Sequence, residues 1–232
     1  MDRHEVAASI RKSWAFLESA GLAETFAFSD PLPLDVEFRD LVLSEDSGHL
    51  SLYQFCLRKS YYNILLFDHS FLQFGWAGGS SVRYAYYPNP HASKPKALHA
   101  FRRYRDMVKS KALDEDEFSQ LVQGMKFDGG VPIFRYEHSE SQYVALSHPC
   151  SHLHIGVHGE NRWAVSRLLS PLAFTLLISK HYYPGEWGLG VIEEQGNERH
   201  QFEEILATER TQCRPLSEEF FCATERQTFH FG

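Results

Sequence analysis

The stretch Ser147-His148-Pro149-Cys150-Ser151-His152-Leu153-His154-Ile155-Gly156-Val157-His158 decides how the rest of the chain is interpreted. From His152 onward polar and apolar residues alternate, which is typical of a strand with one face in a core. The apolar members would face that core. His152 and His154 would lie side by side on the other face, about 6–7 Å apart at Cα. We expect their rings to face an open polar recess that an anionic ligand can reach.

Further strands are predicted in two runs along the chain. Two strand-rich arms at 70–76 and 81–87 flank a pair of glycines, which is the pattern of a hairpin, and the whole region 50–87 looks like a meander of strands. After the predicted helices, residues 131–137 and 143–146 precede the histidine-rich strand. Because strands come in runs instead of alternating with helices, we expect an α+β fold. Its antiparallel sheet would be made by the two strand groups, with helices packed mainly on one face.

Helical spacing of apolar residues is found in five segments. Ser170 and Pro171 suit the N-cap and first turn of one buried helix, which would run through Tyr182. The other predicted helices are 4–20, 97–109, one that opens at Asp114, and 198–210. The 232 residues are expected to form a single domain, in which residues 1–48 are a candidate helical cap on the main α+β body at 49–232.

The composition is that of an ordinary globular protein, with 43% hydrophobic and 23% charged residues. The four cysteines fit no zinc module, and the charged N-terminus does not look like a secretion signal. The longest apolar region, 168–178, is too short to cross a bilayer. We therefore expect a cytoplasmic protein with no membrane partner.

A strongly basic segment, residues 94–111, stands out against the net charge of −7. It could follow a nucleic-acid backbone, although a solvated helix face or a patch for an acidic protein is the alternative. Arg83 in the first hairpin is a further candidate for an anion contact. The candidate nucleic-acid-binding residues are Lys94, Lys96, Arg102, Arg103, Arg105, Lys109 and Arg83.

The histidine-rich strand allows several kinds of chemistry. One imidazole can act as base and the other as acid in phosphodiester transfer, because the ordinary pKa of histidine is near 6.5. Zinc or another divalent metal stays open as a cofactor, with His148, His152 and His154 as the ligands. His158 and Glu137 are the other local candidates for the third ligand. One histidine could also be a nucleophile, and all of them could simply bond backbone at a sheet edge. We favour the reaction without metal.

Two more residues are expected to join the histidine pair. Arg135 could hold a phosphate with two hydrogen bonds, and Glu137 could orient a histidine, unless the two form a cross-strand ion pair. The chain has no phosphate-binding loop, dinucleotide-binding glycine motif, nucleophile elbow or H-E-x-x-H zinc motif. The candidate catalytic residues are therefore His152, His154, Glu137 and Arg135.

Several segments resemble a bacterial family known as domain of unknown function 2290, over residues 50–190. They are Arg83-Tyr84-Ala85-Tyr86-Tyr87-Pro88-Asn89-Pro90, Phe134-Arg135-Tyr136-Glu137, the His148–Gly156 core with its H-P-x-x-H-L-H-x-G pattern, and Leu169-Ser170-Pro171 with Phe174 before Tyr182-Tyr183-Pro184. The aromatic-Arg-Tyr-Glu and histidine pattern is also similar, more loosely, to small toxins of toxin–antitoxin pairs. The resemblance implies a prokaryotic protein from a defence or toxin locus that acts on nucleic acid.

Two functions follow as hypotheses. The first is a metal-independent, phosphodiester-cleaving nuclease of an antiviral or toxin-like system, acting on RNA through the histidine pair. The second is a non-catalytic accessory subunit that docks on a larger nucleic-acid-handling partner from the same locus, in which the histidines are structural.

Overall fold

A seven-stranded antiparallel sheet forms the centre of the computed structural model, which describes residues 1–91, 95–125, 131–157, 161–194, 197–228 and 230–231. The strands lie in the sheet in the order in which they occur in the chain, so each one pairs with the next. They are β1 (Ala23–Phe26), β2 (Ile64–Leu66), β3 (Phe71–Gly78), β4 (Ser81–Tyr87), β5 (Phe134–His138), β6 (Ser151–Ile155) and β7 (Trp163–Ala164). The predicted α+β fold with an antiparallel sheet is confirmed.

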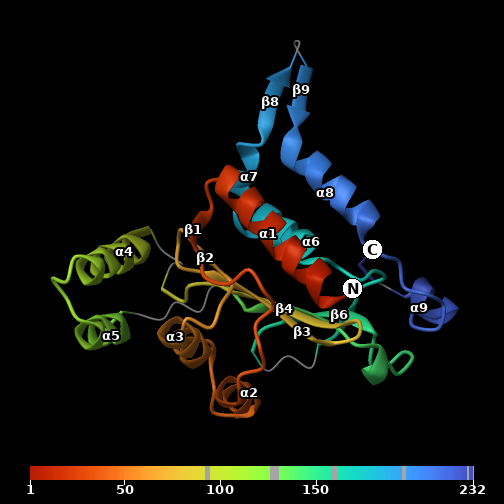
Figure 1. The fold of residues 1–232 in the computed structure, drawn as a ribbon, viewed down its shortest axis with the longest axis horizontal. Coiled ribbons are helices and arrows are strands. Elements are labelled where there is room, and N and C mark those ends of the chain that lie inside the picture. Colours follow the sequence, from red (N-terminus) through yellow and green to blue (C-terminus); the bar gives the residue numbers. More distant parts are fainter. Residues whose placement is uncertain (92–94, 126–130, 158–160, 195–196, 229, 232) are drawn as a thin grey trace.

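The main helical layer covers one face of the sheet (Figure 1). It contains α1 (Arg3–Ser19), α6 (Pro171–Tyr182), α7 (Pro184–Gly188) and α8 (Gln201–Gln212). The largest buried cluster lies between these helices and the sheet, where Phe174 of α6 packs on Phe74 and Tyr84. As predicted, Ser170 caps α6 and accepts a hydrogen bond from the amide of Ala173. This face is therefore largely filled by apolar packing.

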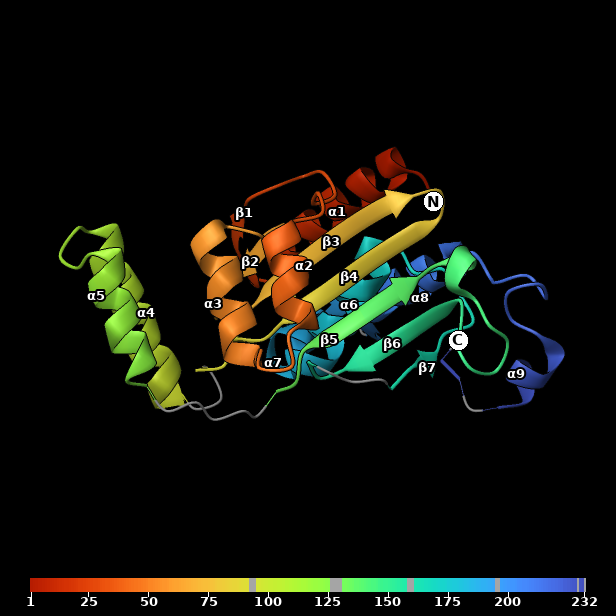
Figure 2. The same ribbon diagram turned by 90° about the horizontal axis from the view of Figure 1, so that it is seen from below.

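A smaller helical layer lies on the opposite face, where α2 (Val36–Leu43) and α3 (His49–Lys59) cover only one end of the sheet (Figure 2). Phe38 and Tyr53 from these helices pack with Phe71 and Tyr87 of the sheet. Beyond them, β4, β5 and β6 present charged and imidazole side chains instead of apolar ones. The uncovered part of this face carries the site described below.

A helical hairpin is inserted between β4 and β5 and stands beside the main body (Figures 1 and 2). It consists of α4 (Pro95–Lys109) and α5 (Glu115–Gln123), with Asp114 capping α5. Phe101 of α4 packs against Phe118 of α5 and against His69 of the body. The hairpin thus has a small core of its own, attached to the body through Phe101.

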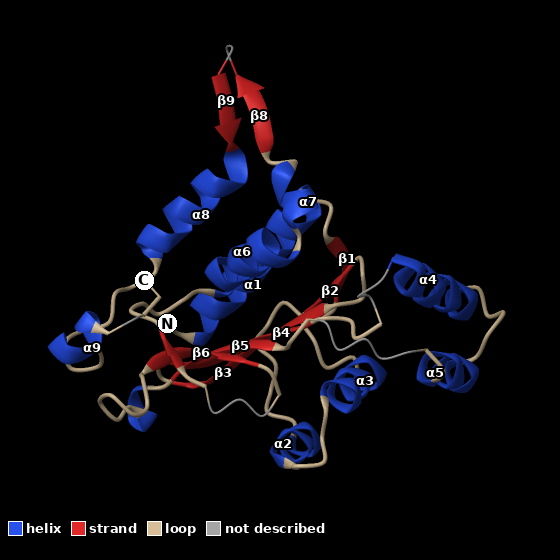
Figure 3. Cartoon of the chain, turned by 180° about the vertical axis from the view of Figure 1, so that it is seen from behind, coloured by secondary structure: helices blue, strands red, loops and turns tan. Residues whose placement is uncertain are grey.

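The C-terminal third adds elements outside the main sheet. Strands β8 (Val191–Glu194) and β9 (Asn197–His200) form a two-stranded ribbon that extends from α7 and α8 away from the sheet (Figure 3). The short helix α9 (Ala223–Gln227) and the 3₁₀ turn η1 (Glu140–Gln142) lie on the side of the molecule away from the α4–α5 hairpin (Figures 1 and 2). None of the described helices is both long and apolar enough to pass through a bilayer.

The N-terminal 48 residues are joined to the rest by pairing and packing. Strand β1 pairs with β2, and α1 contributes Ile10 and Leu17 to the largest buried cluster.

Three local predictions are wrong. Residues 50–59, expected among strands, form most of α3, because Leu52, Tyr53, Phe55 and Cys56 recur at helical spacing and are buried. The expected strand 143–146 is a turn that ends in Leu146 with a φ of 67°. The first residues of the predicted helix 198–210 lie in β9 instead.

Candidate functional site

Two rows of facing residues cross strands β4, β5 and β6. Arg83 of β4 lies opposite Glu137 of β5, which in turn lies opposite His152 of β6. One step along the strands, Arg135 faces His154. Residues two apart on a strand point to the same side, so both rows share the sheet face that α2 and α3 leave uncovered. All four candidate catalytic residues and Arg83 are therefore brought together; we call these five residues the sheet-face cluster.

The two histidine rings of the cluster are neighbours, as predicted, but they are not open to solvent. Their ring centroids are 4.7 Å apart, and a third ring, that of His148, packs edge-on against His152 at 5.0 Å. The exposed fractions of His152 and His154 are 1% and 5%. The expectation that both rings face an open recess is wrong, because Glu137 and Arg135 of β5 lie beside the two rings and the ring of His148 packs edge-on against His152.

The tautomer of His152 follows from its hydrogen bond. Nδ1 lies 2.8 Å from the carbonyl oxygen of Pro149, which can only accept, so Nδ1 carries the proton of the neutral ring. Nε2 then holds a lone pair, and this buried atom has no hydrogen-bond partner within the described ranges. Burial lowers the pKa of His152 to about 4, so the ring is neutral at pH 7. The chain thus presents an unprotonated imidazole nitrogen at the centre of the cluster.

Two guanidinium groups share one carboxylate in the cluster. Arg83 Nε lies 3.5 Å and Arg135 Nη1 3.8 Å from the same atom, Oε1 of Glu137. Burial acts to raise the pKa of Glu137, but Arg83 and then Arg135 outweigh it and hold that pKa below its ordinary value. Burial, followed by the charge of Arg83, lowers the pKa of Arg135. With neutral imidazoles the cluster has a net charge of +1, which favours an anionic ligand.

Two donors of these arginines are not used inside the protein. Nη2 of Arg83 and Nε of Arg135 are buried, and neither has a hydrogen-bond partner among the residues that the structure describes. Arg135 Nη2 makes a long hydrogen bond of 3.4 Å to the carbonyl oxygen of Val157. Buried donors without partners are costly, so their presence next to an excess positive charge indicates a place for a ligand that accepts hydrogen bonds.

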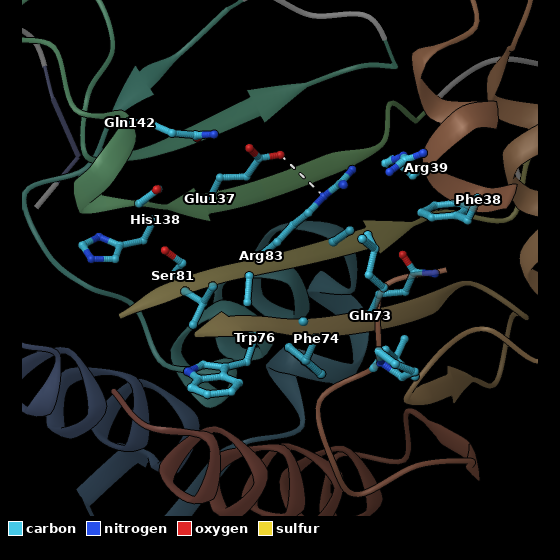
Figure 4. Close-up of a pocket in the computed structure, with 18 of the residues that line it drawn as sticks. Phe38, Arg39, Gln73, Phe74, Trp76, Ser81, Arg83, Glu137, His138 and Gln142 are labelled. Carbon is cyan, nitrogen blue, oxygen red and sulfur yellow. Dashed lines mark ion pairs between the residues drawn. The ribbon is translucent and has the colours of Figure 1, made fainter. Parts of the chain in front are cut away.

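A cavity of about 430 Å³ adjoins the cluster on the side of β3 (Figure 4). Arg83 and Glu137 line it and point toward each other, while His152 and His154 do not line it. Its walls include Arg39 of α2 and Gln142 of η1, and Gln73 of β3 lies on its floor. The cavity therefore gives access to the two charged members of the cluster that are partly exposed.

These polar lining residues were not among the site candidates predicted from the sequence. Gln73 carried a signal that could have been used, because it is the polar residue between Leu72 and Phe74 in an otherwise apolar arm, on the same face as Arg135. Arg39 and Gln142 carried none, since only the packing of α2 and η1 brings them to the sheet.

A group of metal-ligand type is present in the cluster, and its third member is Glu137, one of the three candidates named from the sequence. Ligand atoms of Glu137, His152 and His154 all lie within 4.8 Å of one another, and no other such group occurs in the described part of the chain. His148, the preferred third ligand, is not a member, and His158 lies outside the described residues. His148 lies before β6, so its ring contacts His152 from the side instead of standing in the row.

Most of the predicted nucleic-acid-binding residues are engaged within the protein. Arg102 donates two hydrogen bonds, of 2.9 and 3.1 Å, to the carbonyl oxygen of Phe67. Arg105 pairs with Glu115 at 3.2 Å, and Lys109 pairs with Glu24 at 2.7 Å.

Two members of that set, Lys96 and Arg103, are exposed on α4, and Lys94 lies outside the described residues. Figure 2 places α4 well away from β6, so the segment is not part of the sheet-face cluster.

A comparison with models of protein families shows to which family the chain belongs. The model of an uncharacterized conserved protein, DUF2290, matches residues 35–232. The chain belongs to the DUF2290 family. This match extends beyond the region of resemblance seen in the sequence and includes every residue of the sheet-face cluster. No curated protein and no solved structure matches the chain. Membership of DUF2290 names no activity, so function must be argued from the site.

Proposed function

We propose that this DUF2290 protein is a phosphodiester-cleaving nuclease that acts on RNA in the cytoplasm of a prokaryote, within a defence or toxin-type system. The observation that carries the proposal is the register of β4, β5 and β6. It brings two arginines, a carboxylate and two imidazoles onto one patch of the sheet, beside a cavity. Phosphate chemistry needs positive donors for the phosphate oxygens and a nitrogen base for the attacking oxygen, and the cluster has both.

The arginines supply phosphate binding in this proposal. Arg83 and Arg135 each have a buried donor without a described partner, and together they exceed the charge of Glu137 by one. A phosphodiester carries one negative charge and two free oxygens, so it would complete both the charge balance and the hydrogen bonds. Glu137 keeps the two guanidinium groups together, since both approach its Oε1.

His152 supplies the activating group. Its neutral ring holds a lone pair on Nε2, which activates the attacking oxygen either by taking its proton or by holding an ion that lowers the pKa of that oxygen. In the ion-free version His154, whose ring centroid lies 4.7 Å from that of His152, acts as the acid for the leaving oxygen once it has bound a proton. Both rings are buried, so the substrate must enter along Arg83 and Glu137, and the His148 side of the site must open.

The test is cleavage of end-labelled single-stranded RNA, with DNA of the same sequence as a second substrate. We expect His152→Ala and His154→Ala to cleave at least about 100-fold more slowly than the wild type, the usual effect of removing an acid or base. The matched control is His99→Ala, which removes an exposed histidine of α4 and should leave the rate unchanged. Equal rates for all four proteins, or an inactive wild type whose circular dichroism shows a folded chain, would refute the proposal.

A second candidate function is a non-catalytic subunit that docks on a nucleic-acid-handling partner from the same locus. The observation that favours it is the β8–β9 ribbon, which extends from the body and exposes Val191 and Ile192, next to Leu189 with an exposed fraction of 75%. Apolar side chains gathered on a projecting element are typical of a protein interface. Co-purification with the product of the neighbouring gene tests this function, and Leu189→Ser together with Ile192→Ser should abolish it while His152→Ala does not.

A further inference from the structure

We infer that Glu137, His152 and His154 bind a divalent transition-metal ion of the zinc class. Two imidazoles and one carboxylate, with coordination positions left for water or substrate, are the donor set of catalytic zinc and iron sites. The geometry that supports this ion is the mutual approach of three ligand atoms to within 4.8 Å, contributed by two paired strands. The ion itself does not depend on the nuclease proposal, whereas its role in activating a nucleophile rests on that proposal.

The first independent support is the state of His152. The hydrogen bond from Nδ1 to the carbonyl oxygen of Pro149 holds the ring in the tautomer that a metal ligand needs. The backbone carbonyl plays the part that an outer partner plays for most metal-bound histidines. Nε2 is left buried, unprotonated and without a described partner, in a residue with an exposed fraction of 1%. Such an atom costs free energy unless it accepts a proton or a metal ion.

The second support is the way in which the two arginines approach the Glu137 carboxylate. The printed approach of each arginine to the carboxylate is to Oε1, at 3.5 and 3.8 Å, and none of the described hydrogen bonds involves Oε2, so that oxygen can turn to an ion. A carboxylate that binds an arginine through one oxygen and a metal through the other is held in place by the arginine. Arg83 and Arg135 are thus positioning residues for this ligand.

The distances require the site to contract slightly when the ion binds. Zinc–nitrogen and zinc–oxygen distances of about 2.0–2.2 Å place the ligands of one tetrahedral ion roughly 3.4 Å from each other. Ligand atoms at up to 4.8 Å must therefore approach by about 1–1.5 Å. Rotation about χ1 and χ2 of Glu137, whose side chain is long and partly exposed, covers such a distance for its oxygen. The two histidine nitrogens would approach each other by small rotations of their rings.

The charge of the site determines what else the ion must bind. The ion, two arginines and Glu137 sum to +3 (2 + 2 − 1), because an imidazole that binds a metal ion is neutral. Such a charge is unfavourable inside a protein unless anions offset it. The ion should therefore bind more tightly when phosphate occupies the open coordination positions and hydrogen-bonds to Arg83 and Arg135. A purely structural ion would show no such coupling.

The experiment begins with full-length protein that carries no histidine tag, purified without chelator and analysed for metals. After removal of metal, Co²⁺ is titrated while visible absorption and the melting temperature are recorded, with and without dimethyl phosphate. We expect one equivalent per chain, a rise in melting temperature, and at least a threefold tighter affinity with dimethyl phosphate. A wild type that shows neither a cobalt spectrum nor a change in melting temperature overturns the inference.

Substitutions of the three proposed ligands test where the ion binds. His152→Ala, His154→Ala and Glu137→Gln should each weaken Co²⁺ binding at least about 100-fold, since each removes a direct ligand. His148→Ala is the matched control, because this ring contacts His152 without belonging to the ligand group, and its affinity should stay within threefold of the wild type. Circular dichroism of each metal-free variant separates loss of binding from loss of folding. If the His148 variant loses the ion and the Glu137 variant keeps it, the assignment is wrong.

The two proposals can fail separately. A protein that binds the ion at these residues but cleaves neither RNA nor DNA keeps the metal site and loses the nuclease function. A protein that cleaves RNA in excess chelator and takes up no Co²⁺ keeps the nuclease function and loses the metal site.

Discussion

Arg83 and Glu137 face each other across strands β4 and β5, with Nε of Arg83 3.5 Å from Oε1 of Glu137. The exposed fractions of the two side chains are 38% and 29%, so the pair is neither fully buried nor free in solvent. Arg135 approaches the same oxygen to 3.8 Å. A single carboxylate therefore offsets two guanidinium groups, and the cluster depends on it more than on either arginine.

Glu137→Gln should lower the free energy of unfolding of the metal-free protein by about 1–3 kcal/mol, because it leaves two neighbouring guanidinium groups without a counter-charge. Arg83→Met should lower the free energy of unfolding by a smaller amount, since it removes one of the two positive charges and leaves Arg135 paired with Glu137. Urea denaturation measures both. Asp40→Asn is the control: it removes the exposed partner of Arg39 and should change stability by less than about 0.5 kcal/mol. A Glu137 variant no less stable than the control would mean that the arginines are stabilised by something other than this carboxylate.

Strand alternation and capping could be predicted from the sequence, and both are local properties. The alternation at His152, Leu153 and His154 predicted β6 and the shared face of the two rings, and Ser170 with Pro171 predicted the start of α6. The helix α3 was missed because its aromatic residues, such as Tyr53 and Phe55, also suit strands.

The parts of the site that the sequence could not show depend on register and packing. The sequence does not show which residue of β6 pairs with Glu137, and in the structure that residue is His152. A shift of the register by one residue would turn the Glu137 side chain to the other face of the sheet. The burial of the rings depends on the facing residues of β5 and on the packing of His148. Likewise, Arg102 looks like a surface charge until the fold brings the carbonyl oxygen of Phe67 to it.

The exposed positive charges of α4 are expected to contribute to RNA binding if the basic segment has that role. Lys96→Glu with Arg103→Glu should weaken the affinity for single-stranded RNA and reduce the slope of log affinity against log salt by about 1.4, which is about 0.7 for each lost phosphate contact. Fluorescence anisotropy at several salt concentrations gives both values. The matched change is Glu18→Lys with Glu219→Lys, which shifts the net charge oppositely on other elements. An unchanged slope in the α4 variant would assign this helix to another partner.

Acid should weaken the attachment of the α4–α5 hairpin through His69. Burial, followed by the charge of Arg105, lowers the pKa of His69 to about 4 from its ordinary value of 6.5. Lys109 and Arg102 of α4 act in the same direction, and Glu24 of β1 opposes them. The unfolded chain thus binds a proton more readily than the folded chain. The stabilising contribution of neutral His69 is complete above pH 6.5 and is lost as the pH falls from 6.5 to 4.

The measurement is the free energy of unfolding of wild type and His69→Asn from pH 7.5 to 4.5. Asparagine tolerates the φ of 63° found at this position, so the variant removes the titrating ring with little backbone strain. The wild type should lose on the order of 1 kcal/mol more than the variant across this range. Parallel profiles would show that His69 does not contribute to acid sensitivity.

The buried carboxylate of Asp68 should make Tyr183 important for stability. The hydroxyl of Tyr183 donates to Oδ2 of Asp68 at 3.1 Å and lies 3.0 Å from the hydroxyl of Tyr86. Burial raises the pKa of Asp68, against the hydrogen bonds from Ser70 and Tyr183 that favour its charged form. Tyr183→Phe should therefore lower the free energy of unfolding by about 1.5–3 kcal/mol, the range for a hydrogen bond to a charged group.

Tyr182→Phe is the matched control for this substitution, because the neighbouring ring is half-buried and none of the described hydrogen bonds involves its hydroxyl. Urea denaturation at pH 7 should show a change below about 0.5 kcal/mol for the Tyr182 variant. The Tyr183 variant should also gain stability relative to the wild type as the pH falls. Protonation of Asp68 removes the negative charge that the Tyr183 hydroxyl stabilises in the wild type. Equal effects of the two substitutions would mean that Asp68 is satisfied by Ser70 alone and that the tyrosine acts only through its ring.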